Sequence, residues 1–149
     1  MKAVIPHNLS GIGRLKAHRP SRNEIARRIA SAEGSLRDAR RAELTNGSRL
    51  GLACKAIMQS ALAALCASGF RPSTSEPDHQ QTTIQTLPKT IGLPADRMKV
   101  LDSFRRARNL ADYEGSEVED ARVRESAQYA AQLLADVRGW IKKNRPDLL

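Results

Sequence analysis

Apolar residues recur every three or four positions over five segments of this chain, which is the spacing of side chains on one face of an α-helix. The pattern predicts helices over 22–44, 47–69, 79–86, 95–112 and 116–144. The first segment has the clearest stripe, formed by Ile25, Ile29, Ala32, Leu36 and Ala39. No segment shows a pattern that favours a strand. The chain is therefore predicted to be an all-α protein, an up-and-down bundle of four to five helices.

Capping and turn residues lie between these segments. Ser21 or Asn23 can cap the first helix, because a side-chain oxygen there accepts a hydrogen bond from a free backbone N–H. The segment TNGS at 45–48 indicates a turn, and Gly69 and Gly115 lie where two later helices are expected to end.

The first 22 residues differ from the rest of the chain. They contain two prolines and two glycines and show little periodicity. We expect an irregular N-terminal arm over 1–22, with a short helical turn around 9–15, followed by one helical domain over 23–149.

Composition supports a bundle and a cytoplasmic location. Only 3% of the 149 residues are aromatic, and alanine and leucine supply most of the apolar content. The most apolar segment, Gly51–Phe70, is interrupted by Lys55, Gln59 and two serines, so we expect a buried helix and no membrane span. Residues 1–10 lack the continuous apolar run of a signal peptide.

The two cysteines, Cys54 and Cys66, fall in the same predicted helix. Twelve residues along a helix separate them by roughly 18 Å, which is beyond disulfide reach. We expect two small buried thiols. The sequence shows no cluster of His and Cys around them, so a metal site is not predicted.

The net charge of +9 is concentrated toward the N-terminus. Residues 1–45 contain ten Lys or Arg and four Asp or Glu, a difference of +6. A basic excess of this size suggests a polyanionic partner, most simply nucleic acid. A well-solvated basic surface is the alternative.

The stretch RRARNLADYEG (105–115) places an arginine among core residues. Leu101, Phe104 and Arg108 share one helix face, whereas Arg105 and Arg106 are predicted to reach water. A lone buried guanidinium is costly, so Arg108 needs a partner. That partner is either Asp112, four residues on, or a subunit interface or ligand phosphate.

The segment RNLADY (108–113) resembles the signature of the HEPN superfamily, in which an Arg and a polar residue precede a His. The resemblance extends to 48–73, 77–92 and 133–149 and covers about 9–149. It is nearest to small stand-alone bacterial proteins often described as DNA-binding or uncharacterised.

The resemblance implies a helical homodimer with the motif residues of two protomers facing each other across a cleft. In active members, the Arg and His cut RNA without a metal ion, and many are toxins silenced by a nucleotidyltransferase antitoxin. Here the site would comprise Arg108, Asn109 and Tyr113, with Arg105 and Arg106 holding the RNA backbone. No cofactor is implied.

Tyrosine replaces the histidine of the motif at position 113. Its pKa near 10 makes it a poor base at neutral pH, and His79, from a loop where the family usually has two histidines, is a weaker substitute. We therefore favour nucleic-acid or nucleotide binding and leave enzymatic activity open. A metal-independent ribonuclease toxin and a non-catalytic interaction module for a nucleotidyltransferase are the alternatives.

Overall fold

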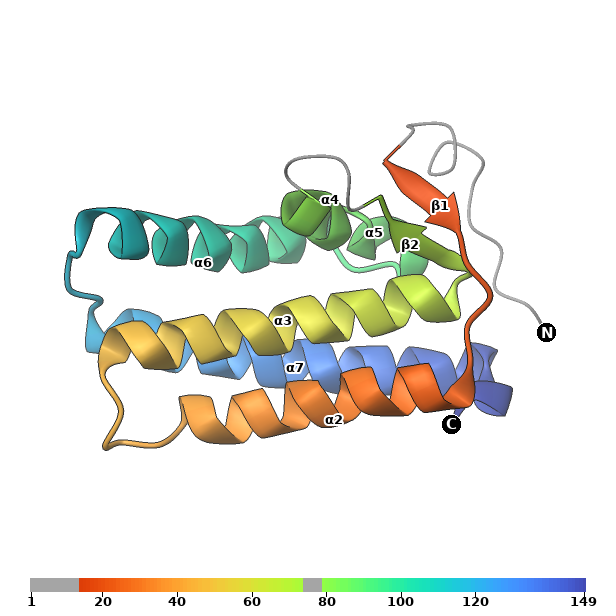
Figure 1. The fold of residues 1–149 in the computed structure, drawn as a ribbon, viewed down its shortest axis with the longest axis horizontal. Helices are drawn as coiled ribbons and strands as arrows, with labels where there is room; N and C mark the ends of the chain where they lie inside the picture. The colour runs from red at the N-terminus through yellow and green to blue at the C-terminus, as the bar shows by residue number, and fades with distance from the viewer. Residues whose placement is uncertain (1–13, 74–78) are drawn as a thin grey trace.

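The computed structural model describes residues 14–73 and 79–149. Four long helices, α2 (Arg22–Ala39), α3 (Asn46–Ala67), α6 (Ala95–Glu114) and α7 (Asp120–Asn144), run alternately up and down the molecule (Figure 1). Two short helices, α4 (His79–Gln85) and α5 (Leu87–Thr90), lie between α3 and α6 in the sequence, and a 3-10 turn (Pro146–Leu148) follows α7. The all-α bundle predicted from the sequence is confirmed.

Helix α3 lies at the centre of the bundle and packs against α2, α6 and α7. Twelve of its 22 residues are buried, many of them alanines, which allow neighbouring helices to approach closely. By length and composition it could also cross a membrane, but 67% of its most apolar window is buried inside the bundle. This burial is what the core helix of a globular domain requires.

One helix begins at its predicted cap, and two helix ends differ from the predicted bounds. Ser21 caps α2, because its Oγ accepts a hydrogen bond from the backbone N–H of Glu24 at 3.2 Å. The α2 helix ends at Ala39, where its apolar stripe ends, and not at 44. Helix α7 begins at Asp120 and not at 116, after a mostly exposed segment.

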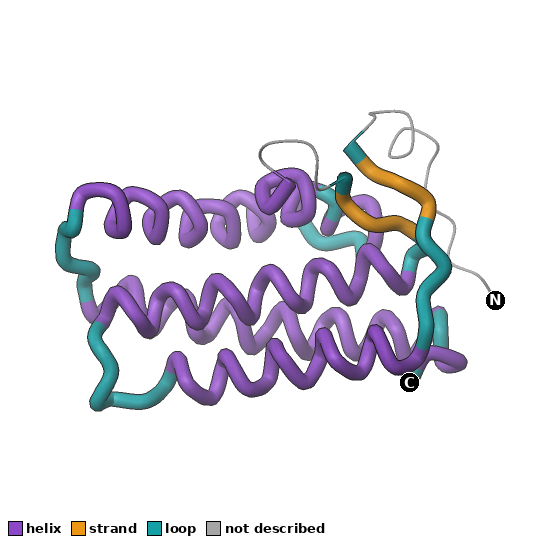
Figure 2. The backbone as a smooth tube through the Cα atoms, in the orientation of Figure 1, coloured by secondary structure: helices purple, strands orange, loops and turns teal. Residues whose placement is uncertain are grey.

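A small sheet contradicts the expectation that the chain has no strand. Strand β1 (Leu15–Ala17) pairs antiparallel with β2 (Phe70–Pro72), at one end of the bundle (Figure 2). Strands of three residues are too short to show alternation, and their pairing joins distant parts of the chain. Within the expected irregular arm, Leu15–Ala17 form a strand, and the helical turn expected around 9–15 lies almost entirely outside the described residues.

Candidate functional site

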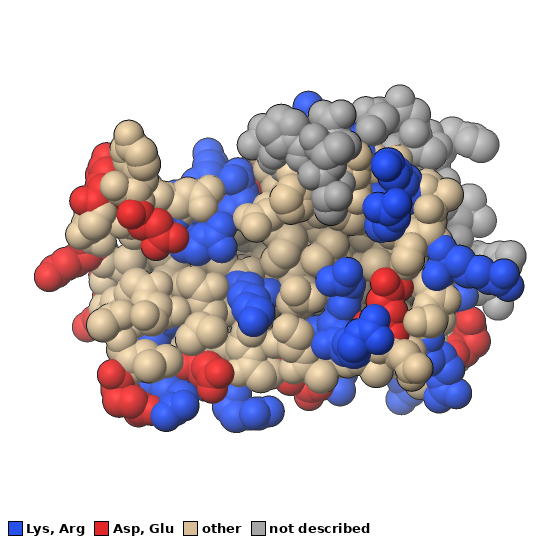
Figure 3. Space-filling view, in the orientation of Figure 1, with Lys and Arg blue, Asp and Glu red and all other residues tan. Residues whose placement is uncertain are grey.

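A cavity of about 330 Å³ opens between α3, α4 and α6. Its apolar lining comes from all three helices and includes Ile57, Ile84 and Leu101. Its polar lining is formed by Lys55, Gln59, Gln80, Arg105 and Arg108. Figure 3 shows this side of the molecule, with Lys and Arg side chains over α6 and α3 around a hollowed surface. The cavity therefore combines an apolar floor with basic and amide groups at its edge.

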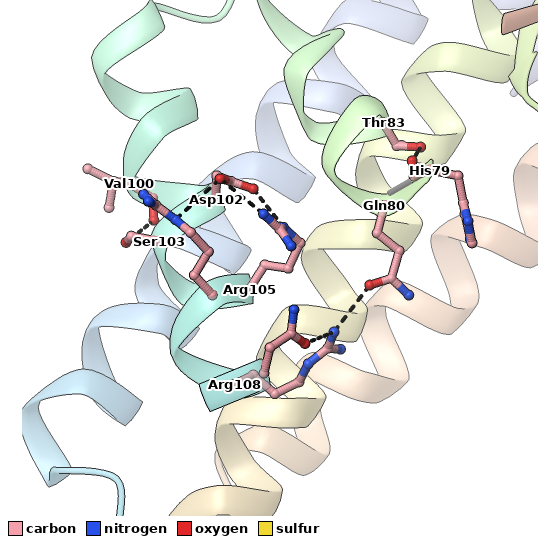
Figure 4. Close-up of polar contacts among 10 residues, drawn as sticks. His79, Gln80, Thr83, Val100, Asp102, Ser103, Arg105 and Arg108 are labelled. Carbon is pink, nitrogen blue, oxygen red and sulfur yellow. Dashed lines mark hydrogen bonds and ion pairs between the residues drawn. The ribbon is translucent and has the colours of Figure 1, made fainter. Parts of the chain in front are cut away.

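Arg108 projects from α6 toward α4 (Figure 4). Its Nη2 donates hydrogen bonds to Oε1 of Gln80 at 3.1 Å and to Oδ1 of Asn109 at 3.0 Å. Asp112, the intrahelical partner considered above, is exposed, and within 14–73 and 79–149 Arg108 forms no ion pair. A half-buried guanidinium thus faces the cavity with only neutral partners.

Arg105 is fixed by a carboxylate. Its Nε and Nη2 donate to the two oxygens of Asp102 at 2.7 and 3.3 Å, and the two side chains are only 14% and 11% exposed. The expectation that Arg105 reaches water was wrong, because it lies four residues after Leu101 and so on the same buried face. Arg106, by contrast, is exposed, with its Nε 3.5 Å from Asp102.

The charges around the cavity do not cancel. Among the described residues, Lys55, Arg105, Arg106 and Arg108 supply four positive charges, and Asp102 and Asp112 supply two negative charges, a net +2. Like charges gathered beside a low-dielectric floor raise the local positive potential. Such a site attracts anions, and phosphate matches the fork of an unpaired guanidinium.

Tyr113 lies apart from this cavity within one protomer. It follows Arg108 by five residues, which turns it about 140° around the helix, and it is 91% exposed. Leu110, three residues earlier and on the same side as Tyr113, is also exposed. The structure therefore brings Arg108 together with Asn109 and Gln80, but not with Tyr113.

His79 begins α4, immediately before Gln80. Its backbone carbonyl accepts a hydrogen bond from Thr83 Oγ1 at 2.7 Å. Its side chain is not part of the cavity lining, although the residue is half-buried nearby. His79 is thus adjacent to the cavity and not directed by any described contact toward Arg108.

Cys54 lies at the cavity wall but is not poised for nucleophilic chemistry. Burial raises the pKa of its thiol to about 11, an effect that outweighs the opposing influence of Arg108 and Arg105. At neutral pH the thiol is therefore protonated, and a thiol reacts far more slowly than a thiolate. Both cysteines are free and buried, as expected from the sequence.

Sequence reasoning did not identify Lys55, Gln59 and Gln80 as site residues. Lys55 and Gln59 were visible as interruptions of the most apolar segment, and such an interruption is the signal for a polar surface on that helix, where Lys55 is exposed and Gln59 half-buried. Gln80 gave no such signal, since its role depends on how α4 packs against α6. In comparisons with known proteins, no protein-family model, no curated protein and no solved structure matches this chain.

Proposed function

We propose that this chain is a HEPN-like protein that binds nucleic acid or a nucleotide, holding a phosphate group at Arg108. The observation that supports this proposal is the guanidinium of Arg108, which faces a cavity with a net positive charge and, among residues 14–73 and 79–149, has only neutral hydrogen-bond partners. The two hydrogen bonds use both hydrogens of Nη2, and each parallel pair of guanidinium donors includes Nη2. A phosphate that replaces Gln80 or Asn109 at Nη2 is therefore held by two parallel N–H donors, which match its oxygens.

The other cavity residues suit the rest of a nucleotide. Lys55, on α3, supplies a second positive charge that can contact the phosphate backbone of the nucleic acid. Met58, which also lines the cavity and is half-buried, offers apolar surface to a base, whereas Ile57, Ile84 and Leu101 are themselves buried. The volume, about 330 Å³, is at the lower end of the ~300–1,000 Å³ found for small-molecule sites. We therefore expect the cavity to accept one nucleotide of a single strand.

The proposal is tested by binding of fluorescein-labelled single-stranded RNA, followed by fluorescence anisotropy at increasing salt. Neutralisation of about three phosphates should give a slope of log K against log salt near −2, from ~0.7 released counterions per phosphate. Unlabelled nucleoside monophosphate should compete at low salt. A lack of binding at low salt, or an affinity that does not change with salt, would contradict the proposal.

A metal-independent ribonuclease is the second candidate, supported by the exposure of Tyr113. A 91% exposed side chain can reach the ligand of another protomer in the dimer that the HEPN resemblance implies. In that arrangement Arg108 would stabilise charge on the scissile phosphate, and Tyr113 would donate a proton to the leaving oxygen.

Cleavage of a cellular RNA pool in EDTA separates the two candidates. We expect the wild-type chain to leave the RNA intact, because a phenol is a much weaker general base than an imidazole at neutral pH. Tyr113→His restores the motif residue and is the variant in which we expect cleavage to appear. Cleavage by the wild-type chain that is lost in Tyr113→Phe would instead establish the ribonuclease.

A further inference from the structure

Three potential metal ligands meet where β1 leads into α2 and where α3 ends, at the sheet end of the bundle (Figure 1). They are a ring nitrogen of His18, a carboxylate oxygen of Glu24 and the sulfur of Cys66, and all lie within 4.8 Å of one another. His18 Nε2 lies 2.7 Å from Glu24 Oε1. Cys66 lies more than forty positions after His18 and Glu24 in the sequence, and none of the three belongs to the Arg108 cavity.

The backbone holds each of the three residues in place. The N–H of His18 donates to the carbonyl of Gly69 at 2.9 Å, which ties this residue to the chain just after α3. Glu24 lies in the first turn of α2, where its N–H donates to Ser21 Oγ. Cys66 is the penultimate residue of α3 and is buried. The three donors therefore converge from separate, ordered elements, as a pre-formed site requires.

We propose that His18, Glu24 and Cys66 bind a divalent cation of the zinc class. A tetrahedral zinc ion has bonds of about 2.0–2.3 Å to N, O and S ligands, which places its ligands roughly 3.3–3.8 Å apart. Rotation of side chains by about 1 Å would bring the three donors to that spacing. Magnesium and calcium prefer oxygen ligands alone, so the mixed N, O and S set selects zinc.

The charges of the site suit a dication. The Cys66 thiol gives its proton to solvent when the metal binds, and its thiolate and the Glu24 carboxylate then supply two negative charges. The side chains of His18 and Glu24 are 25% and 19% exposed, which gives an ion access and leaves a fourth position for water.

Arg28 is a basic group near Cys66 whose positive charge opposes the binding of a cation. Burial and Glu24 raise the pKa of the Cys66 thiol, whereas Arg28 lowers it. The guanidinium of Arg28 is also held by Gln59, since its Nη1 donates to Oε1 at 3.1 Å. Metal binding therefore displaces the Arg28 guanidinium from the sulfur, and the Glu24 carboxylate supplies the attraction for the cation before the thiol loses its proton.

Cobalt(II) provides a spectroscopic test on the full, reduced chain after EDTA has been removed. We expect one Co²⁺ per chain, a near-ultraviolet band from thiolate-to-cobalt charge transfer, and the visible bands of tetrahedral cobalt. Zinc should displace the cobalt, and the melting temperature should rise with the logarithm of the zinc concentration once that concentration exceeds the dissociation constant.

Substitutions assign the ligands. Cys66→Ser should lose the charge-transfer band, and Cys54→Ser, which removes a buried thiol from the same helix, should keep it. If Cys66→Ser does not fold, Glu24→Gln tests the same site, because the Glu24 side chain is partly exposed and its substitution is less disruptive. This variant should bind cobalt at least about tenfold more weakly. A wild-type chain without the band at saturating cobalt, or a band that persists in Cys66→Ser, would overturn the site and leave an ion pair beside a buried thiol.

Discussion

Arg108→Ala is expected to weaken the binding of single-stranded RNA about 10- to 100-fold, because a charge-assisted hydrogen bond contributes ~1.5–3 kcal/mol and each 1.4 kcal/mol is tenfold. The free energy of unfolding should change by less than about 0.5 kcal/mol. In the part of the chain that the structure describes, Arg108 has no carboxylate partner to be left unpaired, and it lies among positive charges whose repulsion its removal would relieve.

The matched control is Arg124→Ala, which removes the same charge from an exposed position on α7. Anisotropy titrations of both variants at several salt concentrations separate a specific contact from general attraction. The slope of log K against log salt should become shallower by about 0.7 in Arg108→Ala, which is one phosphate contact on a single strand. The Arg124 variant should keep the slope and lose little affinity.

Arg108→Lys measures how much of the contact depends on geometry. Lysine keeps the charge but lacks the planar fork, so we expect an affinity between those of the wild type and the alanine variant. Equal losses in Arg108→Ala and Arg124→Ala would show that the chain attracts RNA through its net charge alone. A lower melting temperature with unchanged binding would show that Arg108 is a structural residue.

The helical framework could be predicted from the sequence because its determinants are local. The stripe of Ile25, Ile29 and Leu36 is buried as expected, and Ser21 caps the helix that contains it. Leu101 and Phe104 are fully buried while Arg108, on the same face, turns into a cavity. The position of Arg108 on an apolar helix face was thus the feature of the sequence that pointed to the candidate site on α6.

The partners of that arginine could not be predicted, since they depend on tertiary packing. Gln80 reaches Arg108 from α4, a different helix, whose packing against α6 is not encoded in the local pattern. The two-stranded sheet and the approach of His18 to Cys66 join residues about fifty positions apart. A pattern that repeats every three or four residues carries no information about which distant helix end lies beside which strand.

The basic cavity and the loose attachment of α6 are connected. Three residues of this 20-residue helix are buried, Leu101, Asp102 and Phe104, and all three lie in its first half. The C-terminal turns, which include Arg108, therefore depend on a short anchor. A site rich in like charges opposes close packing, and natural proteins commonly retain such destabilising arrangements where they bind ligands.

Phe104→Ala should remove that anchor. The ring is fully buried and packs edge-to-face on Tyr129, with centroids 5.7 Å apart and an interplanar angle of 61°. Its loss leaves a cavity in the core, and we expect the free energy of unfolding to fall by about 3–5 kcal/mol, measured by urea denaturation. RNA binding should fall as well, because Arg105 and Arg108 are positioned by the same helix.

Leu110→Ala is the control for this change, since it truncates an exposed apolar residue of the same helix. The free energy of unfolding of the monomer should change by no more than about 0.5 kcal/mol in Leu110→Ala. If Phe104→Ala detaches α6 without unfolding the bundle, the denaturation slope will fall with the midpoint, because less surface remains to be exposed. A loss below about 1 kcal/mol with full RNA binding would contradict the anchor, because a fully buried ring cannot be removed so cheaply from a packed core.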